Sequence, residues 1–242
     1  GYDGVDRAAA KEKGIIVSNS PGANAAAVAD QAIALMLGVM RDIPRADAFV
    51  RTGGWGEGKR SNVAAAHGLT GRKVGVYGMG AIGEKIAHRA AAFESDVQYF
   101  SRRKLDHLPY GYHATLESLV DWCDVLLIAV RAGADNRHII NEAMLKRLGA
   151  KGYVINISRG LVIDEDALIS ALRNRTIAGA GLDVFENEPK VRPDFFDLPN
   201  VVLAPHQGGH TIEAHEGMQD AVMQNLDAFF GGKPVPFPVP LD

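Results

Sequence analysis

Arginine, glutamate and histidine occur in three short polar segments, each of which follows a predicted β-strand. The candidate reactive residues are Arg159, Glu188 and His206. Because the carboxyl ends of parallel strands meet at one edge of a sheet, we expect these side chains to gather where α/β proteins bind ligands. A guanidinium could hold an anionic substrate there, while a carboxylate orients an imidazole that supplies a proton. The three segments are Asn156–Gly160, Leu182–Pro189 and Ala204–Gly209.

A glycine-rich turn stands between a predicted strand at 73–77 and a predicted helix at 82–93. Its sequence, Gly-Met-Gly-Ala-Ile-Gly, is typical of a dinucleotide site when it has this strand–turn–helix context. The first glycine permits the tight turn, the second lets a pyrophosphate approach the backbone, and the third lets the helix pack on the strand. The alternative is a glycine-rich turn that binds nothing. The predicted contacts to the pyrophosphate come from Gly78, Gly80, Ala81, Ile82 and Gly83.

The end of the predicted strand at 97–100 indicates which dinucleotide binds. An NAD site normally has Asp or Glu about 20 residues beyond the glycines, where it accepts hydrogen bonds from a ribose 2′-hydroxyl. Ser101 occupies that position, and Arg102 and Arg103 follow it. A hydroxyl and two guanidinium groups would bind a 2′-phosphate that a carboxylate would repel. We therefore predict NADP(H) as the preferred cofactor and NAD(H) as a possible one, the alternative being a solvated basic loop.

Apolar strand patterns alternate with helical patterns along most of the chain, which predicts a doubly wound parallel sheet with helices on both faces. The helix at 25–40 is apolar nearly all round, so we expect it to be buried on several sides and to be a candidate subunit contact. Arg51–Gly58 is a glycine-dense segment in which Trp55 is expected to be a packing anchor. The other predicted strands are 14–17, 125–130, 153–157, 177–184 and 201–203, and the other predicted helices are 116–122, 142–148, 164–173 and 211–230.

Composition excludes several classes of protein. The chain has 242 residues, 47% of them hydrophobic, and a formal net charge of −3, so no basic footprint for nucleic acid is present. The single cysteine, Cys123, excludes a disulfide framework and a Cys-rich metal site, and no metal is predicted. Apolar stretches such as 125–130 are too short to span a bilayer, and the first residues have no signal-peptide pattern. We expect a cytoplasmic protein without a membrane partner.

Taken together, the motifs resemble the D-isomer-specific 2-hydroxyacid dehydrogenase family. The matches follow the family's order: Gly-Tyr-Asp-Gly-Val-Asp at residue 1, the glycine turn, Asn-Ile-Ser-Arg-Gly, Asp-Val-Phe-Glu-Asn-Glu-Pro and Pro-His-Gln-Gly-Gly. Within the family, the basic segment after Ser101 and the Pro-His-Gln-Gly segment look most like NADPH-dependent glyoxylate/hydroxypyruvate reductases. The resemblance implies a homodimer with a Rossmann domain that transfers a hydride from NADPH to a small 2-keto acid, giving a D-2-hydroxy acid.

The resemblance also implies a role for particular residues. Arg159 matches the arginine that holds the carboxylate and carbonyl oxygens of the substrate. His206 matches the acid/base and Glu188 its carboxylate partner, whereas Glu186 is not at the matching position. Asp183 corresponds to the residue near the nicotinamide carboxamide. The further cofactor contacts implied are Val130, Ile157, Ser158, Arg159, His206 and Gly208.

The chemistry of these side chains supports the same roles independently. Hydride delivery to a 2-keto acid builds negative charge on the carbonyl oxygen, and a protonated imidazole can donate a proton to it in the same step. A carboxylate such as that of Glu188 favours the imidazolium form, and Arg159 would stabilise the developing alkoxide. The alternatives are a surface histidine at 206, a strand cap at 159 and a plain residue before proline at 188.

The sequence departs from the family at its start and at 130–133. Relatives carry roughly one further half-domain ahead, so we expect a Rossmann domain at 23–205 and remnants of a split flavodoxin-like substrate domain at 1–22 and 206–242. The chain could be an inactive truncated fragment or part of a longer protein. Arg131 stands where relatives have proline, and it could approach cofactor phosphates or face water. A non-catalytic nicotinamide-binding module, like the corepressor branch of the superfamily, is the alternative function.

Overall fold

The computed structural model describes residues 2–55 and 65–241. The chain divides into two compact units, one formed by 28–208 and the other by 1–27 together with 209–242. The predicted domain boundaries, at 22/23 and 205/206, fall a few residues before those of the two units. All three candidate reactive residues belong to the 28–208 unit.

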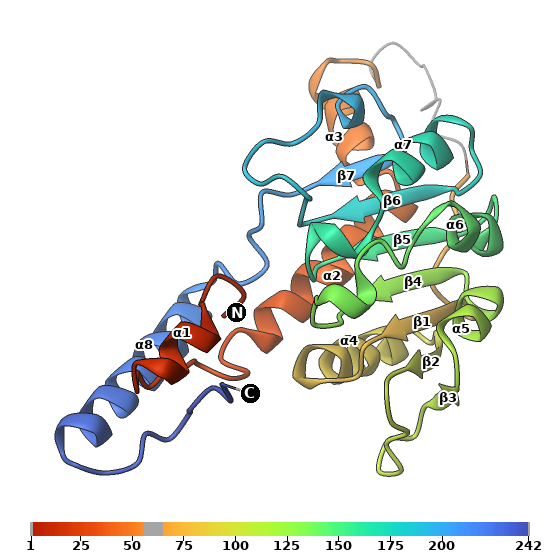
Figure 1. The fold of residues 1–242 in the computed structure, drawn as a ribbon. Coiled ribbons are helices and arrows are strands. Elements are labelled where there is room, and N and C mark those ends of the chain that lie inside the picture. The colour runs from red at the N-terminus through yellow and green to blue at the C-terminus, as the bar shows by residue number, and fades with distance from the viewer. Residues whose placement is uncertain (1, 56–64, 242) are drawn as a thin grey trace. The chain divides into compact units, whose positions relative to one another are not determined.

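The 28–208 unit contains a seven-stranded sheet in which every neighbouring pair is parallel, as the arrows in Figure 1 show. The strand order β3-β2-β1-β4-β5-β6-β7 changes direction between β1 and β4, and the crevice beyond the carboxyl ends at such a point is where ligands bind. The doubly wound prediction is therefore confirmed. The strands are β1 (Lys73–Tyr77), β2 (Asp96–Phe100), β3 (Gly111–His113), β4 (Val125–Ile128), β5 (Tyr153–Asn156), β6 (Gly179–Leu182) and β7 (Val201–Leu203).

Helices connect these strands, and local capping explains where several of them begin. The side chains of Thr115, Asn141 and Asp164 each accept a hydrogen bond from a backbone N–H in the first turn of the following helix. The helices of the 28–208 unit are α2 (Ala25–Met40, which begins in the other unit), α3 (Ile43–Arg51), α4 (Ala81–Ala92), α5 (Leu116–Trp122), α6 (Glu142–Leu148) and α7 (Glu165–Arg173), with short 3₁₀ turns at Ala134–Asn136, Gly160–Val162 and Pro193–Phe195.

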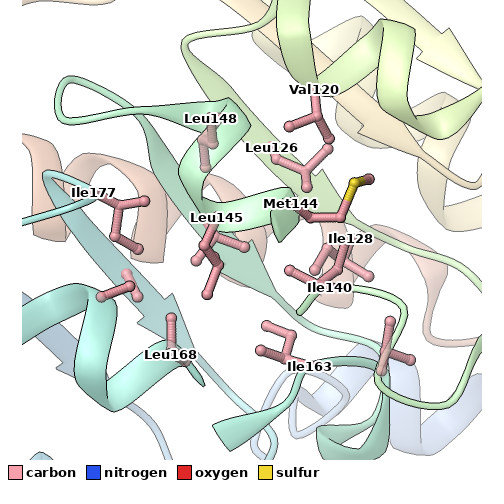
Figure 2. Packing of buried hydrophobic residues seen from close by; sticks show 14 of the residues in the cluster. Val120, Leu126, Ile128, Ile140, Met144, Leu145, Leu148, Ile163, Leu168 and Ile177 are labelled. Atoms are coloured by element: carbon pink, nitrogen blue, oxygen red, sulfur yellow. The ribbon is translucent and has the colours of Figure 1, made fainter. Parts of the chain in front are cut away.

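The core lies on both faces of the sheet, and β4 shows how one strand serves both. Val125 and Leu127 pack into the cluster that includes α2 and α4, whereas Leu126 and Ile128 pack into the cluster formed with α5, α6 and α7. Figure 2 shows this second cluster, with side chains from the sheet and from the helices meeting in one layer. All four β4 residues are buried, which explains the unbroken apolar run in the sequence.

The helix at 25–40 is confirmed as a buried element. From Val28 onward it packs in the sheet core of its own chain, where Ala29, Ala32 and Met36 have no exposed surface. Coverage of the sheet therefore accounts for the buried side of this apolar helix, and its role as a subunit contact stays a prediction. Exposed apolar residues follow it instead, because Ile43, Val50 and Trp55 are 52%, 54% and 66% exposed. Trp55 is thus not the packing anchor we expected, and positions 56–58 of its glycine-dense segment lie outside the described residues.

The unit formed by 1–27 and 209–242 contains α1 (Arg7–Glu12) and α8 (Ile212–Phe230). The buried side chain of Asn225 on α8 joins its two chain segments, donating to the carbonyl of Asn19 and accepting from the N–H of Phe237. The strand predicted at 14–17 is wrong, since only an isolated bridge between Ser18 and Pro238 forms nearby. Ile15 and Ile16 in that segment are more than half exposed. Among the described residues, no helix is long and apolar enough to cross a membrane.

Candidate active site

The glycine turn after β1 has the geometry that a dinucleotide requires. Gly78 has φ +98°, and a Cβ there would lie 2.7 Å from the backbone N and Cα of Val130. A Cβ on Gly83 would lie 2.0 Å from the carbonyl oxygen of Gly78, so the third glycine allows α4 to press on the turn. Gly80 differs, because a Cβ there would meet nothing within 4 Å. The turn therefore packs tightly against the backbone at Gly78 and Gly83, and it leaves space for a ligand beside Gly80.

The start of α4 offers backbone donors to an anion. Gly80 is its N-cap and makes no side-chain cap, and within the described chain no acceptor is found for the N–H groups of Ala81, Ile82 and Gly83. These groups carry the positive end of the helix dipole, which stabilises a phosphate. The residues present thus fit a dinucleotide, with the pyrophosphate beside Gly80.

The basic segment after β2 lies beside this turn. Tyr77 of β1 pairs with Phe100 of β2, and the Gly78 N–H donates to the Phe100 carbonyl at 2.9 Å. Ser101 follows immediately and donates its hydroxyl to the carbonyl of Arg103 at 2.5 Å, which folds the segment into a tight turn. Arg102 and Arg103 are exposed, and neither guanidinium makes an ion pair with another residue in the described ranges. Both are available to an incoming phosphate.

Tyr77, the last residue of β1, is almost fully buried. Burial is the main reason that the pKa of the Tyr77 phenol is raised, a hydrogen bond with Asn136 lowers it, and the charge of Asp135 raises it further. Asn136 is itself buried and holds the segment after β4, accepting from the Gly133 N–H and donating to the Arg131 carbonyl. Asn136 thus orders residues 131–133, which directly follow Val130, the residue whose backbone lies beside Gly78.

Arg159 is held by a turn that the buried side chain of Asn156 organises. The Asn156 amide accepts from the N–H and hydroxyl of Ser158, at 3.0 and 2.9 Å, and donates to the Arg159 carbonyl at 3.0 Å. The guanidinium of Arg159 donates to the Ser158 carbonyl at 2.7 Å. Ile157 and Ser158 are almost fully buried, so only their backbone edge could meet a cofactor.

Asp183 organises the turn that carries His206. Its buried carboxylate accepts from the N–H groups of Gln207 and Gly208, at 3.0 and 2.9 Å, and from the side chain of Gln31 at 3.4 Å. Its carbonyl accepts the His206 N–H at 2.8 Å. The Gly208 N–H is thus used within the protein, and a Cβ there would lie 2.9 Å from the Asp183 carboxylate. This anchoring role of Asp183 was not apparent in the sequence.

Glu188 and His206 form a direct pair. Nδ1 of His206 lies 2.6 Å from Oε2 of Glu188, and Oε1 of Glu188 accepts the Phe185 N–H at 2.9 Å. His206 has φ +52°, a left-handed conformation that non-glycine residues adopt rarely and that often marks functional positions. Its side chain is 46% exposed, and Nε2 has no partner among residues 2–55 and 65–241. The imidazole is therefore fixed at one nitrogen and open at the other.

The three candidate residues lie in the loops that follow the neighbouring strands β5, β6 and β7, at the carboxyl ends of these strands. Asn156 of β5 pairs with Leu182 of β6, which pairs with Leu203 of β7, so the segments that follow these strands start side by side. The loops also meet directly, because a Cβ on Gly160 would lie 1.9 Å from the carbonyl carbon of Phe185. This edge is also the one at which the glycine turn follows β1. The described residues contain no group of three or more His, Cys, Asp or Glu side chains placed to hold a metal.

Fold and site together define a dinucleotide-binding domain. A polar cluster that contains a histidine lies at the carboxyl ends of its strands, where such domains bind ligands. Residues 33–208 match the family described as "D-isomer specific 2-hydroxyacid dehydrogenase, NAD binding domain". The chain belongs to this family, and the matched residues lie within the 28–208 unit.

Named relatives and a solved structure are similar along nearly the whole chain. Hydroxyphenylpyruvate reductase of Plectranthus scutellarioides is 43% identical over 239 residues, which cover 99% of this chain and 75% of the relative. Glyoxylate/hydroxypyruvate reductase A of Arabidopsis thaliana is 41% identical with the same coverage. The NADPH-dependent glyoxylate/hydroxypyruvate reductase of Sinorhizobium meliloti, solved with NADP and malonate, is 40% identical and superimposes with a TM-score of 0.94 over 100% of this chain and 75% of that one.

Proposed function

We propose that this protein is an NADPH-dependent reductase that converts a small 2-keto acid of the glyoxylate/hydroxypyruvate type into the D-2-hydroxy acid. The observation that carries the proposal is the contact of 2.6 Å between Nδ1 of His206 and Oε2 of Glu188. This contact lies beyond the carboxyl ends of the strands of a dinucleotide-binding sheet. A carboxylate-oriented imidazole with an open nitrogen is what a carbonyl reduction needs as proton donor. The names of the two relatives support a 2-keto acid substrate, and the Arabidopsis thaliana relative is named for glyoxylate and hydroxypyruvate themselves.

We assign the cofactor to the 28–208 unit. The backbone N–H groups at the start of α4 would hold the pyrophosphate beside Gly80, and Arg102 and Arg103 would hold a 2′-phosphate. The solved relative with bound NADP supports the preference for the phosphorylated cofactor. When bound, the nicotinamide supplies the hydride. The unit formed by 1–27 and 209–242 then corresponds to part of the substrate domain.

His206 serves as the proton donor in this proposal. Its Nδ1 donates to Glu188, which fixes the ring, and its Nε2 is left without a partner among the described residues. As C2 of the keto acid accepts the hydride and its carbonyl π bond breaks, the carbonyl oxygen takes the proton from Nε2. The charge of the imidazolium is lost as that of the alkoxide is neutralised, so no free alkoxide accumulates.

Arg159 serves as the anion clamp. The turn built by Asn156 brings its guanidinium to the same edge, where it would hold the substrate carboxylate and the carbonyl oxygen. A guanidinium matches carboxylate geometry through paired N–H donors, so it orients the substrate as well as attracting it. The shared 2-keto acid group explains how relatives that differ in the rest of the substrate can use one arrangement.

We also propose that the protein is a homodimer that operates in the cytoplasm. The exposed apolar side chains of Ile43, Val50 and Trp55 follow one another closely in sequence, and a contact with a second copy would cover them. Cys123 is a free, buried thiol, which is usual for a protein of a reducing compartment.

Oxidation of NADPH, followed by its absorbance with glyoxylate or hydroxypyruvate, tests the proposal. We expect turnover by the wild-type chain and a loss of about 10²–10⁴-fold in His206→Ala, with the dissociation constant of NADPH unchanged. His88→Ala, which removes an exposed histidine from α4, is the matched control and should keep full activity. NADPH binding without any oxidation by the wild-type chain would instead show a non-catalytic nicotinamide-binding module.

A further inference from the structure

Glu186 lies two residues before Glu188 and takes no part in the proton transfer described above. Its Oε1 accepts hydrogen bonds from Nη2 of Arg137 at 2.6 Å and from Nε2 of His138 at 2.9 Å. The Glu186 side chain is only 21% exposed, whereas Arg137 is 57% exposed. One carboxylate oxygen on the loop of Glu188 is thus held by two side chains from the segment after β4.

The backbone of Glu186 is held by a third residue. Its N–H donates to Oε1 of Glu165 at 2.8 Å, and Glu165 is a carboxylate with only 6% of its surface exposed. A buried carboxylate is costly unless it is hydrogen-bonded, so this contact is a fixed part of the loop. Glu165 opens α7, whose N-terminus stabilises negative charge.

The segment 137–138 also reaches the loop of Arg159. The His138 N–H donates to the carbonyl of Leu161 at 2.8 Å, and His138 has φ +50°. Leu161 follows Arg159 and Gly160, and Gly160 packs directly on the backbone of Phe185 and Glu186. His138 therefore joins the two loops: its backbone holds the loop of Arg159, and its side chain holds the loop of Glu188.

We propose that Glu186, with Arg137 and His138, is a positioning residue that holds the carboxylate of Glu188 and the guanidinium of Arg159 in their working arrangement. This inference rests on the proposed function, because it gives Glu186 a purpose in that reaction. Isolated surface ion pairs contribute little to stability, so the value of this contact lies in fixing two loops that carry reactive groups. Loss of the contact should loosen the support of His206 through Glu188 while leaving the cofactor turn intact.

Steady-state kinetics of Glu186→Ala provide the first test. We expect kcat for keto acid reduction to fall by about tenfold or more, with the dissociation constant of NADPH within about twofold of wild type. Glu142→Ala is the matched control, since it removes an equally short 2.6 Å pair, with Lys146, from an exposed helix surface. The conservative variant His138→Gln, which keeps a donor near Glu186, should retain more activity than His138→Ala.

A double-mutant cycle separates positioning from simple stabilisation. If Glu186 acts through Glu188, then Glu186→Ala should lower kcat much less in a Glu188→Gln background than in wild type. Equal factors in both backgrounds would overturn the inference, as would a wild-type kcat in Glu186→Ala.

Hydrogen exchange tests the inference separately from the proposed function. The Phe185 amide, which donates to Glu188, and the His138 amide, which donates to Leu161, should exchange at least about tenfold faster in Glu186→Ala than in wild type or Glu142→Ala. Unchanged exchange at both amides would overturn the inference even if the enzyme is active. The wild type could fail to reduce keto acids while the two amides still exchange faster in Glu186→Ala. That result would overturn the proposed function and would preserve the link between the two loops.

Discussion

At the scale of single residues, the structure shows how an exposed histidine can be held still. His206 is fixed through its backbone by Asp183 and through its ring by Glu188, and the following N–H groups bind the Asp183 carboxylate. A catalytic group must be held to within a fraction of an ångström, and these contacts restrain it from two sides. In the proposed reaction, the open Nε2 of His206 would be the atom that donates the proton.

Replacing Glu188 tests that arrangement directly. Glu188→Gln keeps an oxygen that can accept the Phe185 N–H but removes the negative charge beside His206. We expect kcat for keto acid reduction to fall by about 10²-fold, because a charged partner orients and stabilises the imidazolium better than a neutral amide. Stopped-flow measurement of NADPH oxidation checks this, and a variant as fast as wild type would exclude Glu188 as the partner of the acid.

The choice of cofactor is a second prediction for individual side chains. Arg102→Ala combined with Arg103→Ala should weaken NADPH binding by about 10–100-fold, because charge-assisted hydrogen bonds to the 2′-phosphate are lost. NADH lacks that phosphate, so its dissociation constant should change little. Lys151→Ala, at an exposed lysine on another loop, is the control for a general change of charge. Equal losses for NADPH and NADH, measured by titration calorimetry, would show that these arginines do not recognise the phosphate.

At the scale of elements, substitutions of Gly80 and Gly83 should have opposite effects on cofactor binding and on stability. In Gly80→Ala the new Cβ meets nothing in the protein, so the free energy of unfolding should change by less than about 1 kcal/mol while NADPH binding is weakened strongly. In Gly83→Ala the Cβ would collide with the Gly78 carbonyl at 2.0 Å, so the fold itself should be destabilised. Urea unfolding and cofactor titration of both variants check this contrast, and a wild-type affinity for NADPH in Gly80→Ala would argue against a pyrophosphate beside that residue.

Elements with a local signal were predictable from the sequence. The helices at 116–122 and 142–148 occur at the predicted residues, because Thr115 and Asn141 cap them and their apolar faces have helical spacing. The elements α1, α3 and β3 were not predicted because they lack a buried apolar face: α3 and β3 bury no residue, and α1 buries only Ala10. The strand expected at 14–17 failed because an apolar run becomes a strand only where a sheet can pair with it.

The site shows the same division between local and long-range information. Arg159, Glu188 and His206 could be proposed from the sequence because each follows a strand in a recognisable motif, and the structure pairs Glu188 with His206. The contacts of Glu186 with Arg137 and His138 could not, because they join segments about 50 residues apart and depend on a left-handed backbone at His138. The anchoring of the His206 turn by Asp183 was missed for the same reason, since its Gln31 partner comes from α2.

At the scale of the whole molecule, the exposed apolar residues after α2 predict self-association. Val50→Asp should convert a dimer into a monomer, because a buried unpaired charge at an interface costs several kcal/mol. Sedimentation velocity should give twice the mass of one 25.9 kDa chain for wild type and that of a single chain for the variant. Lys151→Asp, at an exposed lysine of another loop, is the control for the change of charge. A wild-type chain that sediments as a monomer at micromolar concentration would contradict this proposal.

The central claim is that a hydride from bound NADPH reaches the C2 carbon of a keto acid held beside Arg159, Glu188 and His206. The most direct measurement uses hydroxypyruvate and NADPH that carries deuterium at both C4 positions of its nicotinamide ring, with the product analysed by NMR and chiral chromatography. We predict D-glycerate with one deuterium at C2 from the wild-type chain and almost none from His206→Ala. Binding of NADPH without deuterium transfer, or label in the L-isomer, would contradict the claim.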